Sequence, residues 1–204
     1  MFYLLMAALL IGVIASLKLR GTSHSTETVG CYKIMSFKDG KTIFESCSKS
    51  KKGKVFIPSK ITTIGFGAFS GCNMIEEVEL NIECEVIGRN AFEHCVSLKS
   101  VIGKSSLEAI RETAFKGCKM LEKIYLGEKI KTIEAYAFLD CNNLKEIHLR
   151  TTFVPEVYES SFSDVDKKQC VLYVMPGTKE MFEKSPIWGL SLIHISEPTR
   201  RSYI

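Results

Sequence analysis

Hydrophobic residues return along this chain at a fixed interval of 23 residues. Phenylalanine shows the interval most clearly, at Phe69, Phe92, Phe115 and Phe138, and Phe162 follows after 24. Each of the first four is preceded by alanine and followed three residues later by cysteine, at Cys72, Cys95, Cys118 and Cys141. Other apolar positions keep the same register, among them Ile64, Ile87, Ile110 and Ile133, and then Val78, Val101, Ile124 and Ile147. Such self-similarity over four copies indicates a repeat protein.

A single unit of this length cannot bury its own apolar face, so the copies must stack, with equivalent residues forming ladders along the stack. Segments such as Ile75–Leu80 end in apolar–polar alternation, which predicts a strand with one buried face. Stacking in chain order makes these strands parallel. A second short extended piece, as at residues 61–64, precedes an Ala-Phe turn, where the small alanine lets the chain fold closely while the phenylalanine fills the coil.

The pattern I-x-x-x-A-F-x-x-C-x-x-L-x-x-V-x-L resembles the BspA-like leucine-rich repeats of bacterial surface proteins, over residues 54 to about 189. The resemblance implies a leucine-rich-repeat solenoid of right-handed stacked coils, with a parallel β-sheet on one face and short helical turns. It also implies export and a role in adhesion or protein binding, and it carries over no catalytic residues. The chain departs from the pattern at Gly103, which replaces a strand leucine, and in the unit 152–174, which keeps Phe162 without the cysteine.

The repeat sets the predicted domain boundaries. Residues 59–149 hold four repeats, and residues 150–189 hold a degenerate fifth repeat and a truncated C-terminal cap. Residues 16–58 form an N-terminal cap, where Asp39-Gly40 between two strand-like segments predicts a β-hairpin. Caps of this kind close the exposed ends of a solenoid.

Both ends of the chain carry segments that we expect to lie outside the fold. Residues 1–15 begin an apolar, uncharged stretch that predicts a secretory signal peptide. Because no positive charge precedes the stretch and Lys18 follows it, a retained anchor and an error in the start of the frame stay open as alternatives. Residues 190–200, LSLIHISEPTR, resemble the translated adaptor of a sequencing library, so we expect residues 190–204 to be an artefact.

Charge and composition argue against several functions. The 27 Lys and Arg against 23 Asp and Glu leave a net charge of +4, which predicts no nucleic-acid partner. The basic run Lys49–Lys54 is expected to be a solvated turn rather than a binding patch. The ladder cysteines lack paired C-x-x-C spacing and nearby histidines, which favours packing over zinc. The scattered histidines form no catalytic triad, and Gly65-Phe66-Gly67 lacks the context of a phosphate loop. We expect no catalysis, no metal and no cofactor.

Cys31 and Cys47 differ from the ladder cysteines because both lie in the predicted N-terminal cap. A two-residue turn at Asp39-Gly40 pairs Cys47 with Tyr32 and leaves Cys31 on the opposite face. A three-residue loop instead places Cys31 directly across from Cys47. In an exported protein this second arrangement permits a disulfide. The sequence leaves both arrangements open.

Candidate binding residues follow from the strand alternation. Because Val78 and Leu80 point inward, Glu77 and Glu79 point outward. The equivalent outward positions in the later strands are Ser100 and Ile102, Lys123 and Tyr125, and Glu146 and His148. This predicts a column of Ile102, Tyr125 and His148 beside a charged column, with Tyr125 as the anchor. Such a solvent-facing column is unexpected for a purely structural sheet, but cross-strand pairs of this kind stabilise any sheet, so a binding surface and a structural role both stay open for these residues.

The sequence therefore predicts a secreted or cell-surface binding module, adhesin-like and monomeric. It would recognise a protein or glycan partner through this sheet face, and would meet a membrane only through an N-terminal anchor. The alternative is an accessory repeat domain of a longer protein, including an enzyme, whose remainder is missing.

Overall fold

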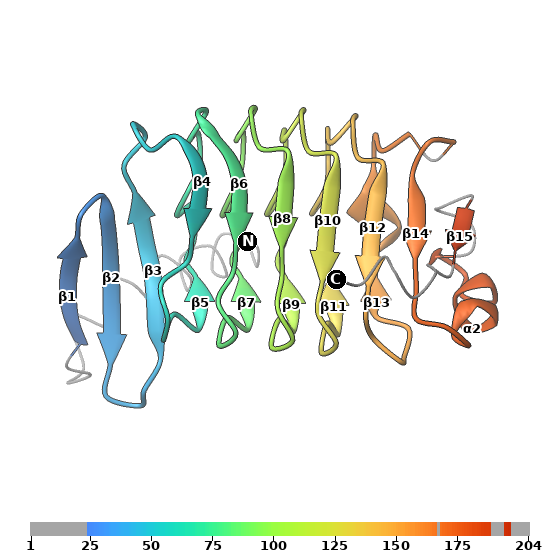
Figure 1. Ribbon diagram of the computed structural model, residues 1–204, viewed down its shortest axis with the longest axis horizontal. Helices are drawn as coiled ribbons and strands as arrows, with labels where there is room; N and C mark the ends of the chain where they lie inside the picture. The colour runs from blue at the N-terminus through green and yellow to red at the C-terminus, as the bar shows by residue number, and fades with distance from the viewer. Residues whose placement is uncertain (1–23, 167, 189–193, 197–204) are drawn as a thin grey trace, which may run out of the picture.

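The computed structural model describes residues 24–166, 168–188 and 194–196, which form a row of stacked coils (Figure 1). The row runs from the N-terminal strands at one end to a short helix at the other. Two β-sheets extend along it, because successive coils contribute one strand to each sheet. The predicted solenoid with a coil of about 23 residues is confirmed.

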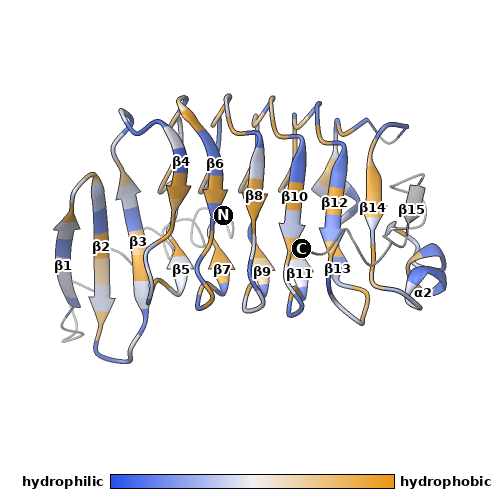
Figure 2. Cartoon of the chain, in the orientation of Figure 1, coloured by the Kyte–Doolittle hydropathy of each residue, from blue (hydrophilic) through white to orange (hydrophobic). Residues whose placement is uncertain are grey.

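One sheet has seven strands and is parallel throughout. Hydrophobic positions recur in its strands from coil to coil (Figure 2). Its inward residues, such as Val78, Val101 and Ile124, lie opposite one another in register and are fully buried. The strands are β4 (Gly53–Phe56), β6 (Ile75–Glu79), β8 (Ser100–Ile102), β10 (Lys123–Leu126), β12 (Glu146–Leu149), β14 (Val171–Tyr173) and β15 (His194–Ser196).

The other sheet has eight strands and arises from the second extended piece of each coil together with the N-terminal strands. Its first three strands are antiparallel neighbours, and from β3 onward the pairing is parallel. The strands are β1 (His24–Val29), β2 (Tyr32–Phe37), β3 (Thr42–Cys47), β5 (Thr63–Ile64), β7 (Val86–Ile87), β9 (Ala109–Ile110), β11 (Thr132–Ile133) and β13 (Glu156–Val157).

A column of stacked phenylalanines fills the coils. Neighbouring rings have centroids 4.6–5.3 Å apart, and every ring is at most 2% exposed: Phe44, Phe69, Phe92, Phe115, Phe138 and Phe162. The column confirms the predicted ladder and extends it, because Phe44 joins it from within the predicted cap. Trp188 packs against the last ring, and its indole nitrogen donates a hydrogen bond to the Pro155 carbonyl at 2.9 Å.

The Ala-Phe segments form hydrogen-bonded turns, and at the corresponding place in the fifth unit, where Ser161 precedes Phe162, the chain forms the 3-10 helix η1 (Glu159–Phe162). These turns also bond from coil to coil. The amide of Phe92 donates to the Ala114 carbonyl at 2.8 Å, and that of Phe115 donates to the Ala137 carbonyl at 2.8 Å. Each coil is therefore tied to the next at its turns as well as along both sheets.

The ladder cysteines form a second buried column. The thiols of Cys95, Cys118 and Cys141 each donate to the carbonyl of the phenylalanine one coil earlier, over 3.0, 3.0 and 3.1 Å. Burial raises the pKa of Cys95 to about 12, so the buried thiol stays protonated at neutral pH. These cysteines pack as core residues and satisfy a carbonyl in each turn.

The N-terminal hairpin between β2 and β3 combines features of both predicted turns. Its loop is three residues long, closed by a hydrogen bond from the Phe37 amide to the Lys41 carbonyl at 2.9 Å. A β-bulge at Glu45 then shifts the register by one residue, so Tyr32 opposes Cys47. The amide of Ser48 reaches the Cys31 carbonyl at 2.8 Å. The loop alone would have set Cys31 opposite Cys47, and the bulge moves it away.

At the C-terminal end, strand β14 is followed by a turn and the helix α2 (Lys179–Glu183). Three tail residues, His194–Ser196, pair with β14 as strand β15, although we expected the tail to lie outside the fold. An open strand edge accepts the backbone of any extended segment, so this pairing leaves the predicted origin of the tail untested. The rest of the tail and the predicted signal peptide lie outside the described residues. No helix in the described ranges is long and apolar enough to cross a membrane.

Candidate functional site

The seven-stranded sheet brings together the predicted outward column. Ile102 lies opposite Tyr125, and Tyr125 lies opposite His148. The structure adds Tyr173, which lies opposite His148 on β14. The rings stack face to face, with centroids 4.3 Å apart for Tyr125 and His148 and 4.4 Å apart for His148 and Tyr173. We call Ile102, Tyr125, His148 and Tyr173 the outer row.

Stacking decides which part of each ring a partner can reach. The His148 ring is covered by a tyrosine on each face, and its side chain is 14% exposed. Burial lowers the pKa of His148, and its contact with Glu146, 3.0 Å from Nε2, opposes that shift. The imidazole is therefore neutral at pH 7, and the outer row presents mainly ring edges and the two tyrosines.

The predicted charged residues flank the outer row and pair with one another. Lys123 contacts Glu146 at 2.8 Å, which raises the pKa of Lys123. Burial alone would raise the pKa of Glu146, but the hydrogen bonds from Lys123 and His148 lower it. Charge on this part of the face is therefore neutralised within the sheet.

Strands β4 and β6 repeat this arrangement together with the segment that follows β8. Lys104 lies 2.7 Å from Glu79, and that hydrogen bond lowers the pKa of Glu79. Lys54 reaches Glu79 at 3.3 Å and Glu77 at 3.7 Å, and its ammonium lies 4.9 Å from the centre of the exposed Phe56 ring. A partner would meet paired charges here as well.

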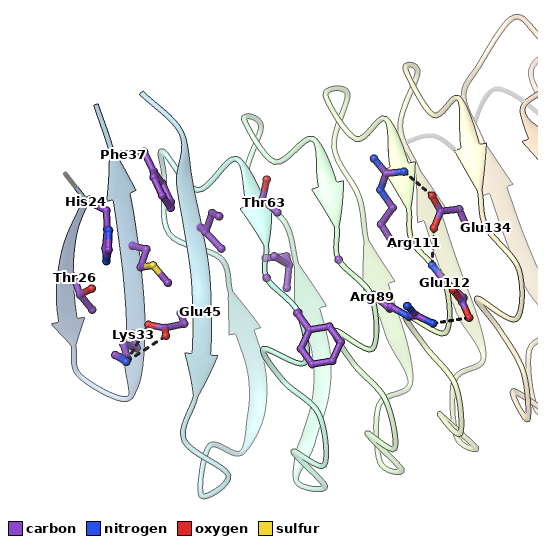
Figure 3. Close-up of a pocket in the computed structure, with 16 residues that line it drawn as sticks. His24, Thr26, Lys33, Phe37, Glu45, Thr63, Arg89, Arg111, Glu112 and Glu134 are labelled. Atoms are coloured by element: carbon purple, nitrogen blue, oxygen red, sulfur yellow. Dashed lines mark hydrogen bonds and ion pairs between the residues drawn. The ribbon is translucent and has the colours of Figure 1, made fainter. Parts of the chain in front are cut away.

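A second candidate surface was not predicted. A groove of about 820 Å³ lies on the eight-stranded sheet, lined by side chains from β1 to the coil of β11 (Figure 3). The volume is typical of ligand sites. Its apolar part contains Met35, Phe37, Ile43 and Phe66, and its charged part contains Arg89, Arg111, Glu112 and Glu134.

Part of the groove is formed by residues at equivalent positions of successive repeats. Phe66, Arg89 and Glu112 occupy the same repeat position, 23 residues apart. Two glycines keep the floor low, since a Cβ at Gly65 would lie 2.8 Å from the Phe44 carbonyl oxygen and one at Gly88 2.5 Å from that of Ile64. Phe66 is 63% exposed. The sequence feature that could have revealed the groove is Phe66, which lies between two glycines at a repeat position that is charged in the next two coils.

The charges of the groove are also paired. Arg89 contacts Glu112 at 2.9 Å, and Arg111 is bonded to Glu134. Among the described residues, no group of three or more His, Cys, Asp or Glu side chains is arranged to hold a metal ion. The chemistry that both surfaces offer is apolar and aromatic contact beside balanced charge.

The repeat pattern, the stacked coils and the cysteine column can now be compared with known proteins. The family model of the BspA type leucine rich repeat region matches residues 39–169 in six copies. The chain belongs to this family. The BspA-type match begins at residue 39, so it includes the coil of Phe44 that the sequence analysis placed in the cap. A comparison with curated proteins finds no match.

Solved bacterial leucine-rich-repeat structures share the BspA-type fold. The pneumococcal vaccine antigen PcpA has a TM-score of 0.52 and 17% identity, over 86% of this chain and 48% of that one. A leucine-rich repeat protein of Bacteroides ovatus has a TM-score of 0.51 and 21% identity, over 88% and 41%. The T. pallidum leucine-rich repeat protein has a TM-score of 0.50 and 19% identity, over 74% and 81%. At these identities the likeness concerns the fold alone.

Proposed function

We propose that this chain is a non-catalytic binding module displayed at a cell surface, and that it holds a protein partner against the outer row. The observation that carries the proposal is the row itself: Ile102, Tyr125, His148 and Tyr173 follow one another across four strands while the flanking charges are paired. Tyrosine is enriched in protein interfaces and at their energetic centres. Surface display suits the family, and one structural neighbour is a vaccine antigen.

The stacking favours a protein over a glycan. A sugar packs its apolar face on a free aromatic face, and here the faces of His148 are covered by tyrosines at 4.3 and 4.4 Å. Ring edges and tyrosine hydroxyls can instead contact side chains and backbone of a protein. Balanced charge on both sides of the row gives no preference for a strongly charged partner.

The size of the face predicts modest affinity. Seven strands at a spacing of ~4.8 Å give a width of roughly 30 Å, and short strands make the face roughly 13 Å tall. This is well below the ~800 Å² per partner of a standard interface. Tight attachment would therefore rest on several copies displayed together.

The test compares two aromatic residues on different sheets. Purified full chain is applied to a panel of secreted and extracellular-matrix proteins and to a glycan array, and the hits are measured again with Tyr125→Ala, Phe66→Ala and Lys52→Ala. We expect a protein hit whose binding falls about tenfold or more with Tyr125→Ala, the size of a hot-spot loss. Phe66→Ala and Lys52→Ala should leave that binding unchanged.

Two results would count against the proposal. Loss of binding with Phe66→Ala and not with Tyr125→Ala would move the site to the groove. A glycan hit that depends on Tyr125 would keep the surface and reject the class of partner.

A second candidate function is an accessory repeat domain within a longer protein. The observation that favours it is that this chain spans 48% of the pneumococcal structure and 41% of the Bacteroides ovatus structure. Recovery of the reading frame beyond Gly189 in the source genome separates the two. A short closing strand and a stop support the binding module alone, and a catalytic domain supports the accessory role.

A further inference from the structure

The first cysteine of the ladder has a different neighbour from the others. Cys95, Cys118 and Cys141 each donate to the carbonyl of a phenylalanine 26 residues earlier. In the coil before Cys72 the column phenylalanine is Phe44, and Phe44-x-x-Cys47 repeats the spacing of Phe69-x-x-Cys72, so Cys47 occupies the cysteine position of that coil. The Cys47 thiol donates to the Ser48 carbonyl at 3.5 Å, and Cys47 and Cys72 lie close enough to shift each other's pKa, which is raised for Cys47 and lowered for Cys72. A repeat position that elsewhere meets a carbonyl thus meets a second thiol.

The backbone holds these two residues together. The Cys47 amide donates to the Ala68 carbonyl at 2.9 Å, in the turn that leads to Cys72. Phe44 on β3 stacks on Phe69 with centroids 4.6 Å apart. Because both contacts come from the rigid stack of coils, the approach of the two sulfurs is built into the joint between the N-terminal hairpin and the first regular repeat.

A third thiol lies beside this pair. Besides Cys72 and burial, Cys31 also raises the pKa of Cys47, and the Ser48 amide donates to the Cys31 carbonyl at 2.8 Å. Cys31 and Cys47 are partly exposed, whereas Cys72 is 1% exposed. Cys47 therefore stands between a second exposed thiol and a buried one, and a reagent from solvent can reach it first.

Charge favours Cys72 as the group that ionises. The contact with Cys47 lowers the pKa of Cys72, burial opposes this, and the Lys49 ammonium lowers it further. Lys49 lies close, since a Cβ on the adjacent Gly71 would come within 3.2 Å of its Nζ. The same contact raises the pKa of Cys47. A thiolate is the nucleophile in disulfide exchange, so in the step that closes the bridge Cys72 attacks and Cys47 is attacked.

We propose that Cys47 and Cys72 are a redox-sensitive cross-link site that fastens the N-terminal hairpin to the first repeat. The oxidant is a low-molecular-weight disulfide such as oxidised glutathione. Cys47, the thiol of the pair that a reagent from solvent reaches, loses its proton and attacks the oxidised glutathione, forming a mixed disulfide and releasing one glutathione, which takes up the proton; because the pKa of Cys47 is raised, this is the slow step. The Cys72 thiolate then attacks the Cys47 sulfur, forms the protein disulfide and releases the second. Two protein thiols lose two electrons and two protons, and the oxidant gains them.

The test maps the bridge in the wild-type chain, so it needs no variant to fold. Folded full chain is treated with oxidised glutathione, its free thiols are alkylated, and the tryptic peptides are read by mass spectrometry. We expect the Cys47 peptide linked to the Cys72 peptide, with Cys118 reduced. We also expect the oxidised chain to unfold at a higher urea concentration than the reduced chain. A bridge between Cys31 and Cys47, or alkylation of all three thiols after oxidation, would overturn the proposal.

Two matched variants sharpen the result. Cys31→Ser should keep the link and the rise in the urea midpoint on oxidation, because Cys31 is not one of the bridged pair. Cys72→Ser should lose both. Retention of the midpoint rise in Cys72→Ser would show that another pair of thiols forms the cross-link, and would reject the assignment.

Discussion

The molecule carries two ladders of stacked rings, one inside the coils and one outside. In both, successive coils contribute one residue each. The inner ladder uses phenylalanine at every rung, at most 2% exposed. The outer row changes from Ile102 through Tyr125 and His148 to Tyr173, with ring centroids 4.3 and 4.4 Å apart. Every coil offers the inner ring the same enclosed space, so one residue type serves throughout. The outer positions lack that constraint, so their side chains tell more about what the surface meets.

The largest expected difference between the ladders is in stability. Phe115→Ala removes a fully buried ring from the middle of the inner ladder and should lower the free energy of unfolding by about 3–5 kcal/mol. The matched control is Phe66→Ala, the same substitution at a ring that is 63% exposed, which should change it by no more than about 0.5 kcal/mol. Urea unfolding measures both. Equal losses would show that the inner ladder does not dominate the stability.

A smaller effect is expected at the buried cysteines. Cys118→Ala leaves a small cavity and removes the thiol hydrogen bond to the Phe92 carbonyl at 3.0 Å. The free energy of unfolding should fall by roughly 1–2 kcal/mol. The same urea experiment checks this, and a variant as stable as the wild type would mean that neither the sulfur nor its hydrogen bond supports the core.

The inner ladder could be predicted from the sequence, and much of the outer surface could not. A fixed interval of 23 residues identifies the buried rings, since equivalent positions in stacked coils must share one environment. Tyr173 was missed because it follows His148 by 25 residues, and Phe44 because it precedes Phe69 by 25. The bulge at Glu45 leaves no mark in the apolar–polar pattern.

The groove was still harder to predict from the repeat pattern. It depends on how the N-terminal strands pack beside the coils, which brings Phe37 and Phe66 to one hollow from segments 29 residues apart. A repeat pattern reports what is the same in each coil. The repeat pattern gives no information on surfaces that the first coil forms with a segment outside the repeat.

The outer row should matter less for stability than the inner ladder. Tyr125→Ala removes one stacked ring and its contact with Ile102, and cross-strand pairs of this kind contribute roughly 0.2–1 kcal/mol each. We expect a loss of about 0.5–1 kcal/mol by urea unfolding. A loss as large as that of Phe115→Ala would make the outer row a structural element, and its role in binding would lose its main support.

The smallest effect should come from protonation of His148. Burial lowers the pKa of His148 in the folded protein below its ordinary value of 6.5, so the unfolded chain binds the proton more readily. This contribution to stability is complete above about pH 6.5 and is lost as the pH falls from there toward the folded-state pKa. The urea midpoint of the wild type should therefore fall more steeply over that window than that of His148→Gln. Parallel pH profiles would contradict the assignment.

In the proposed function, the outer row and not the groove meets the partner. Hydroxyl-radical footprinting of the full chain, with and without a bound protein from the panel, reads both surfaces in one experiment because aromatic side chains react readily. We expect the partner to protect Tyr125 and Tyr173 while Phe66 stays as reactive as in the free chain. Protection of Phe66 and Phe37 with Tyr125 unchanged would contradict it.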